Sequence, residues 1–371
     1  MLRTRGRCRD DANIYMTRHN NNMNRMAVKL MSVMAFIGLM GLVGCTGNEV
    51  VDPEDQQRSI SFAGSLQEGT AISRAEQGLE DLLDNKTFKV WGYKNTAVSG
   101  DNYTDYQVVM PSYIVNYGSN TAYTTTSNTH DWEYVGQGTN QLIKYWDYSA
   151  KAYRFFAYAL GNGTANAVTV DSSDDTKVSF TTTVDATTET NRNAAPYFTE
   201  LWFSNDKLAD YGKPVILKFL KPFARVRFQF RFMDGLEADH SDLSLIKFCP
   251  VAGTIPTSGT VTVNYPLKGT DTKENWSVAA ASSISSFTVD DQWYYVMPAT
   301  SQSDYRLEVA VVTNELQTAN VPAQFMQWQP GFQYTYVFKI LKGGSITLDV
   351  IQVAVKDWNE KSTVDRTVYN W

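Results

Sequence analysis

The chain has 371 residues, of which 43% are hydrophobic and 19% are charged, so it can form a substantial core and is not mainly disordered. Aromatic residues reach 13%, a composition that favours β-strands and argues against a coiled coil, a helical bundle or a multi-span membrane protein. Seven basic and two acidic residues give positions 1–45 a net charge of +5, which leaves −11 on the remainder and disfavours nucleic acid as a partner.

The N-terminal region has the pattern of a secretion signal. Residues 30–43 are apolar except for one serine, and Arg25 and Lys29 precede them. This run is shorter than the roughly 20 residues of a membrane-spanning helix and fits the core of a signal peptide. It ends in "LVGC", which resembles the lipobox of bacterial lipoproteins, so we predict a leader and signal peptide over 1–45 and lipidation at Cys45. The alternative is an ordinary signal peptide with an incidental cysteine.

Residues 1–22, which precede the signal peptide proper, and residues 46–58, which follow it, are predicted to be unfolded. Residues 1–22 are rich in arginine and asparagine and do not fit a signal peptide, so Met23 or Met26 is a more natural start. Residues 46–58 are acidic and polar and contain a proline. Such a composition is typical of a flexible tether, here one that would hold a folded body away from a membrane.

Alternation of apolar and polar residues predicts strands throughout the body. It is clearest at 224–232 and again at 332–340. In the first of these strands, Arg225, Arg227 and Arg231 share the face opposite the phenylalanines, so we expect all three to face water. An anion site on that face is the alternative, and it depends on charge alone.

The remaining elements point to the same class. One short helix is predicted at 75–84, and no helices alternate with strands, which disfavours a doubly wound α/β fold. The pattern therefore predicts an all-β protein made of β-sandwiches. Further strands are predicted at 59–64, 87–93, 106–110, 152–159, 177–183, 198–203, 215–219, 244–249, 259–265, 292–297 and 305–312.

Two irregularities divide this pattern. The apolar phase of residues 346–355 changes near Val350–Ile351, which predicts one extra residue, as in a β-bulge. A polar stretch at 204–213 suggests a boundary, so we predict an N-terminal domain over 59–213 and a C-terminal domain over 214–371.

The sequence contains no pattern typical of an enzyme or a metal site. The GxSxG elbow, the P-loop and a complete GxGxxG are absent, and only Cys249 lies in the body, so no disulfide pair is available there. His130 and His240 are far apart in polar loops. We therefore expect no catalytic residue, metal or other cofactor. The aromatic clusters at 131–134 and 145–148 could stack on sugars, but core or edge packing is the more usual role of such residues.

A series of short segments resembles the fimbrillins, the lipoprotein pilin precursors of Bacteroidales. The likeness covers nearly all of the chain after Cys45, and it depends on the order and spacing of segments that are individually weak. In order they are "SISFAGS" at 59–65, "SRA" at 73–75, "FKVWGY" at 88–93, "KAYRFFAYA" at 151–159, "LKFLKPFARVRFQF" at 217–230, "WYYVMPA" at 293–299, "WQPGFQYTYVFKI" at 328–340 and "VAVKDWNE" at 353–360.

The resemblance implies a fold, a place and a mode of assembly. It implies two transthyretin-like β-sandwich domains in tandem, routed to the outer membrane by a lipid anchor and surface-exposed in a fimbrium. In this family an Arg-specific protease cuts after the first strand, and here the matching bond is Arg74–Ala75. The strand that would be displaced includes Ile60, Phe62 and Leu66.

The same resemblance implies partners. The groove left by the displaced strand would accept a C-terminal strand of another fimbrial subunit, since an open sheet edge and an apolar slot are both satisfied by an extended segment. The donor candidates are Val364, Val368 and Trp371, within the wider tail 350–371. A host or bacterial surface ligand is a further expected partner. The alternative function is a surface glycan-binding lipoprotein that uses exposed aromatic residues.

Overall fold

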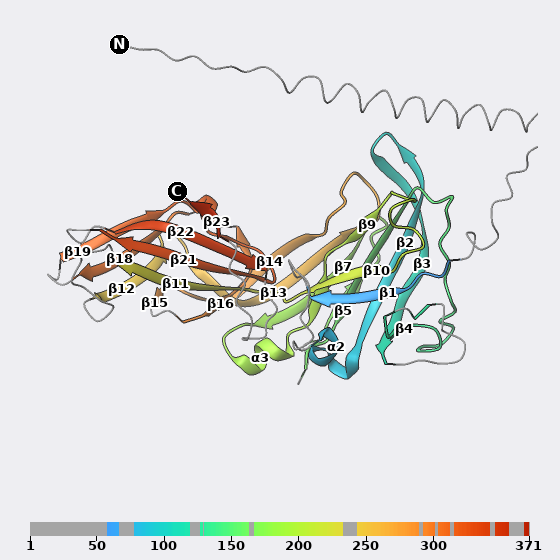
Figure 1. The fold of residues 1–371 in the computed structure, drawn as a ribbon, viewed down its shortest axis with the longest axis horizontal. Coiled ribbons are helices and arrows are strands. Elements are labelled where there is room, and N and C mark those ends of the chain that lie inside the picture. Colours follow the sequence, from blue (N-terminus) through green and yellow to red (C-terminus); the bar gives the residue numbers. More distant parts are fainter. Residues whose placement is uncertain are drawn as a thin grey trace, which may run out of the picture. The chain divides into compact units, whose positions relative to one another are not determined.

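We describe a computed structural model of the chain, shown in Figure 1. The described residues are 58–66, 78–118, 127–128, 130–162, 167–232, 243–288, 292–300, 303–311, 315–341, 346–355 and 367–370. Almost all elements among them are strands, which confirms the all-β class. No helix within these ranges is long and apolar enough to cross a membrane.

The largest sheet has the strand order β1-β10-β8-β5-β2-β3-β4, and β9 pairs with β5. A second sheet faces it, with the order β14-β13-β7-β6. These strands are β1 (Phe62–Leu66), β2 (Thr87–Ser99), β3 (Asn102–Tyr117), β4 (Trp132–Glu133), β5 (Ala152–Ala159), β6 (Thr169–Asp171), β7 (Lys177–Asp185), β8 (Tyr197–Thr199), β9 (Trp202–Ser204), β10 (Val215–Leu220), β13 (Ile255–Pro266) and β14 (Asn275–Ile284).

An aromatic core joins these two sheets because alternate residues of their strands point inward. Trp91 and Phe156 of the large sheet meet Phe180 and Tyr265 of the smaller one, and the rings of Phe156 and Tyr265 stack 4.2 Å apart. Strands β10 and β13 follow residue 213 but pair with β1 and β7, which precede it, and β14 pairs with β13. The domain boundary placed there stays a prediction.

Two further sheets pack face to face in the C-terminal half. Their orders are β16-β11-β21-β22-β23 and β15-β12-β18-β19, and β17 pairs with β20. Phe228 and Tyr336 of the first sheet contact Phe248 of the second in a common core. The strands are β11 (Ala224–Phe232), β12 (Leu243–Pro250), β15 (Phe287–Thr288), β16 (Tyr294–Val296), β17 (Ala299–Thr300), β18 (Tyr305–Val311), β19 (Glu315–Val321), β20 (Gln327–Trp328), β21 (Phe332–Ile340), β22 (Ile346–Val355) and β23 (Thr367–Asn370).

The described helices are short. They are α2 (Leu79–Leu82), α3 (Glu189–Ala194), and the 3-10 turns η2 (Asp84–Lys86) and η4 (Ala323–Phe325). The helix predicted at 75–84 is therefore shorter at its C-terminal end than expected, because Leu83 is already extended, with φ −95° and ψ 138°. The start of that predicted helix lies outside the described residues.

The structure settles two details of the predicted strands. Val337 pairs with Val350 but Phe338 pairs with Leu348, so Asp349 is an extra residue and the predicted bulge is confirmed. The expectation that all three arginines of β11 face water is wrong for Arg225, which is 2% exposed. Its guanidinium donates two hydrogen bonds to Oε1 of Gln333 on the neighbouring strand β21, which satisfies the buried charge in part.

Candidate functional site

Strand β1 forms one end of the largest sheet (Figure 1). It runs parallel to β10, in a register from Phe62 opposite Val215 to Leu66 opposite Phe219. Just before the strand, the carbonyl of Ser61 accepts a hydrogen bond from the amide of Val215 at 2.8 Å. Strand β10 is therefore the one partner of β1 among the described strands.

The residues just before β1 bond to a segment other than β10. The amide of Ile60 donates to the carbonyl of Lys144 at 2.7 Å, and the amide of Trp146 donates to the carbonyl of Arg58 at 3.0 Å. The hydroxyl of Tyr134 donates to the carbonyl of Ile60 at 2.9 Å. The segment around 144–146 thus closes over the entry to the strand.

An ion pair fixes that closing segment. Lys94 Nζ lies 2.6 Å from Oδ2 of Asp147, and Oδ1 of the same carboxylate accepts hydrogen bonds from the amide and hydroxyl of Ser149. The hydrogen bond from Lys94, followed by those from Ser149, lowers the pKa of Asp147 to about 2. Because Lys94 lies on β2, the pair ties the segment beside the start of β1 to the interior of the sheet.

Apolar side chains at the start of β1 and just before it fill the core of the large sheet. Ile60 and Phe62 are both 0% exposed. The ring of Phe62 meets Phe88, Tyr134 and Phe155 edge to face, at centroid distances of 6.2, 5.9 and 5.7 Å. Burying one such side chain contributes about 1.5–3 kcal/mol to the free energy of unfolding. Removal of the strand would therefore leave an empty apolar slot and lower the stability of the protein.

Gly64 allows other elements to pack closely over β1. A Cβ atom at this position would lie 2.5 Å from Cδ2 of Leu79 and 3.4 Å from the ring of Trp132. Leu79 belongs to α2 and Trp132 to β4, so both elements cover the strand at its glycine. A glycine inside a strand often marks such a close approach, and this was the one sequence signal for these contacts.

The sequence-predicted site residues fall into two groups. Ile60, Phe62 and the backbone of Leu66 come together in or beside β1, as described above. Cys45, Arg74, Ala75, Val364 and Trp371 lie outside the described residues.

The remaining donor candidate, Val368, lies in β23. This strand pairs antiparallel with β22, where Asn370 opposes Val350 and Thr367 opposes Gln352. The described end of the tail therefore lies along the edge of the C-terminal sheet of its own chain.

Most of the aromatic residues considered for sugar stacking belong to the core. Trp132 and Trp146 are each 3% exposed and Tyr134 is 0% exposed, whereas Tyr145 is 44% exposed. Core packing is thus confirmed for the first three. Sequence reasoning missed that Trp132 and Tyr134 form part of the slot around β1, because their contacts with it are remote in sequence.

The described residues form no evident metal site. They include no group of three or more His, Cys, Asp or Glu side chains placed to hold a metal ion. His130 is exposed, and Cys249 is a buried free thiol. What the arrangement around β1 provides is an apolar slot that holds one extended segment.

Comparisons with solved structures find Bacteroidales proteins at low sequence identity. A candidate cell adhesion protein from Bacteroides uniformis is 16% identical, with a TM-score of 0.37, over 83% of this chain and 100% of the other. A fimbrial assembly protein from Parabacteroides distasonis is 12% identical, with a TM-score of 0.35, over 80% and 95%. The C-terminally truncated tip fimbrial protein Mfa3 from Porphyromonas gingivalis is 12% identical, with a TM-score of 0.33, over 75% and 95%.

No curated protein sequence matches the chain significantly. A family model described as fimbrillin-like matches residues 73–358, which is well over half of the chain. The chain therefore belongs to the fimbrillin-like family and is a fimbrial or adhesive surface protein rather than an enzyme.

Proposed function

We propose that the protein is the precursor of a fimbrial subunit that assembles by protease-triggered strand exchange. In this proposal, cleavage at Arg74–Ala75 releases β1, and an extended segment of another subunit enters the vacated slot. The observation that carries the proposal is the position of β1: it ends its sheet, yet Ile60 and Phe62 are completely buried.

The contacts of β1 explain why cleavage would be needed. The strand is held by ladder hydrogen bonds to β10, by the 144–146 segment and by burial of Ile60 and Phe62. While the chain is intact, these contacts form within one molecule and outcompete any external segment. After a cut, the strand can dissociate, and a neighbour's segment can then supply both the backbone pairing and the apolar side chains.

The C-terminal tail is the proposed donor. Val364, Val368 and Trp371 are spaced among polar residues, as expected of a segment whose alternate side chains enter pockets. The pairing of β23 with β22 supports a tail that can be lifted from a sheet edge without breaking into the sheet. Deleting 359–371 should give a folded monomer that is cut normally but does not polymerise. Continued polymerisation of the truncated chain would place the donor elsewhere.

Limited proteolysis tests the cleavage step. Trace trypsin should cut the purified precursor first after Arg74, and oligomers should then form slowly and in proportion to concentration. Arg74→Ala should block both events, whereas Arg306→Ala, which changes an exposed arginine on β18, should block neither. Oligomers that form equally well without the cut would contradict strand exchange.

A lipid anchor at Cys45 is the proposed route to the outer membrane. It is supported by the apolar run at 30–43 and the "LVGC" ending. Expressed in a host that processes lipoproteins, the wild type should carry an acyl group and partition into membranes, and Cys45→Ala should do neither. An unacylated wild type that partitions in the same way as the variant would refute the anchor.

A further inference from the structure

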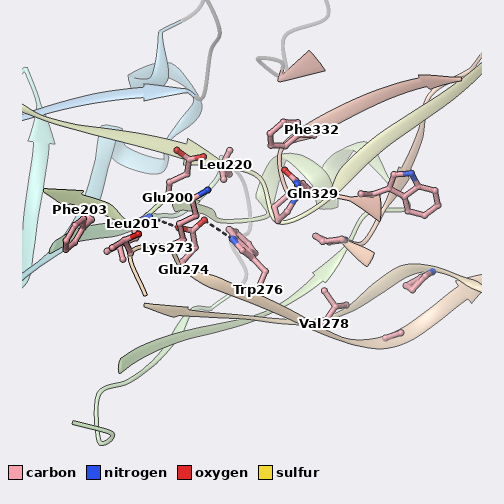
Figure 2. A pocket seen from close by; sticks show the side chains of 16 residues that line it. Glu200, Leu201, Phe203, Leu220, Lys273, Glu274, Trp276, Val278, Gln329 and Phe332 are labelled. Atoms are coloured by element: carbon pink, nitrogen blue, oxygen red, sulfur yellow. Dashed lines mark hydrogen bonds between the residues drawn. The ribbon is translucent and has the colours of Figure 1, made fainter. Parts of the chain in front are cut away.

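A pocket of about 870 Å³ is lined by residues other than Ile60, Phe62 and the aromatic rings that Phe62 contacts (Figure 2). Most of its wall comes from three segments: residues 200–203, which run into β9, residues 272–280, which lead into and along β14, and residues 328–332, which run from β20 into β21. Leu220, Pro256 and Pro298 complete the lining. Its volume lies within the roughly 300–1,000 Å³ typical of small-molecule sites.

A buried arginine holds one wall of the pocket in place. Arg154 is 0% exposed, and its Nη1 donates to the carbonyls of Asp271 at 2.7 Å and Pro266 at 3.2 Å. These bonds fix the loop immediately before the 272–280 wall. The guanidinium also lies 4.8 Å from the ring centroid of Phe203, which lines the pocket.

A carboxylate fixes the tryptophan beside that loop. One oxygen of Glu274 accepts from the amide of Leu201 at 2.7 Å, and the other accepts from Nε1 of Trp276 at 3.2 Å. Figure 2 shows the indole of Trp276 next to Glu274, with the hydrogen bond between them drawn. The orientation of the indole is therefore set before any ligand arrives, which lowers the entropic cost of binding.

The lining combines ring faces with hydrogen-bonding groups. Trp276 and Phe332 are half-buried aromatic residues, while Lys273 and Gln329 are exposed and Glu200 is half-buried. A pyranose presents apolar C–H groups on its faces and hydroxyls at its rim, and these need aromatic surface and amide, ammonium or carboxylate partners, respectively.

The charges of the pocket give no preference for an anionic ligand. Glu200, Glu274 and Lys273 line it, and Lys218 Nζ lies 3.7 Å from Glu200, so these four charges sum to zero. The body as a whole is acidic. An uncharged polar ligand therefore fits the site better than an anion, which needs an excess of positive charge.

We propose that this pocket binds a neutral oligosaccharide, with a pyranose ring against Trp276 and its hydroxyls bonded to Gln329, Lys273 and Glu200. This function is separate from subunit assembly, because the pocket is complete in the uncleaved chain. The protein would thereby contact a glycosylated surface through its folded body.

A glycan array and a titration test the proposal on the uncleaved, monomeric chain, so that failure of strand exchange does not affect the result. The probe is a printed array of neutral and sialylated oligosaccharides, and the neutral glycan retained most strongly is then titrated by isothermal calorimetry. We expect Trp276→Ala to weaken binding roughly tenfold and Gln329→Ala roughly threefold.

Matched controls separate the pocket from the general surface. Trp293→Ala changes a half-buried tryptophan on the arginine-bearing side of β11, and Gln324→Ala changes an exposed glutamine in η4, so both should leave the affinity unchanged. Gln329→Ala keeps the test decisive if Trp276→Ala does not fold. Three results would overturn the proposal: no glycan retained, only sialylated glycans retained, or equal affinity in the Gln329 variant and the wild type.

Discussion

Strands β1 and β14 each end a sheet, but they differ in how deeply their side chains are buried. Phe62, at the start of β1, and Ile60, two residues before it, are completely buried, whereas the side chains of β14 are half-buried or exposed, with Ser277 and Ala279 among the exposed ones. An edge position leaves one side of a strand without a hydrogen-bonded neighbour. It does not determine how much stability the protein loses when that strand is removed. Removing β1 would empty a slot in the core, whereas the exposed residues of β14 fill no such slot.

The two strands also differ in how they are connected. Strand β14 follows β13 through a short connection and pairs with it antiparallel along most of its length. Strand β1 instead pairs in parallel with β10, about 150 residues further along the chain. A single cut after β1 would thus leave it attached by noncovalent contacts alone. A cut after β14 would leave that strand covalently joined to β13, its partner in the hairpin.

The largest expected effect comes from emptying part of the slot. Phe62→Ala removes a completely buried ring that meets three other aromatic rings, so the free energy of unfolding should fall by about 3–5 kcal/mol. Urea denaturation measures this difference. Ser277→Ala on β14 is the control and should change stability by less than about 0.5 kcal/mol. Similar small losses in both variants would contradict the contrast between the two edges.

The sequence predicted much of this fold because strand periodicity is a local signal. The alternation at 224–232 and 332–340 and the phase change predicted near Val350–Ile351 all have direct counterparts in β11, β21 and β22. Strand β14 was missed because its sequence, "NWSVAAASSI", is mostly small residues at an exposed edge and lacks clear alternation. Strand β19 was missed as well.

The site was less predictable than the fold. The resemblance to the fimbrillins singled out Ile60 and Phe62, but the covering contacts of Leu79 and Trp132 depend on how remote segments pack. The burial of Arg225 was missed for a similar reason, since its partner Gln333 lies on a strand more than 100 residues later. Periodicity shows which face of a strand is apolar, and it does not show what covers the other face.

A smaller effect should follow from filling the space above Gly64. The added methyl of Gly64→Ala would meet Cδ2 of Leu79 at 2.5 Å, so we expect a loss of about 1–3 kcal/mol in the free energy of unfolding. In a Leu79→Ala background the clash is absent, so the same glycine change should cost much less. Urea denaturation measures the free energy of unfolding of each variant. If the losses of the two single variants add up in the double variant, the clash with Leu79 is not what makes Gly64→Ala destabilising.

Acid should weaken the start of β1 through Asp147. Folding lowers its pKa from the ordinary value of 3.8 to about 2, so its stabilising contribution is present above about pH 4 and is lost as the pH falls towards 2. Asp147→Asn should lower stability at pH 6 and show a smaller decline between pH 4 and 2. We expect the effect to be modest, since the side chain is 34% exposed.

The partner of Asp147 supplies the control. Lys94→Met removes the first cause of the lowered pKa, so it should flatten the same part of the stability profile. Thermal denaturation at several pH values gives the comparison. If both variants lose as much stability between pH 4 and 2 as the wild type does, that loss comes from other carboxylates.

The smallest effect is expected on β14 itself. Trp276, Val278 and Ala280 line the pocket, so alternation places Ala279 on the other face of the strand, where it is exposed. Ala279→Lys removes no core contact and should change the free energy of unfolding by less than about 0.5 kcal/mol. A lysine on an exposed edge also opposes edge-to-edge pairing, so the variant should remain monomeric in sedimentation. A loss above about 1 kcal/mol would mean that β14, like β1, is held by its side chains, and the distinction between the two edges would then depend on connectivity alone.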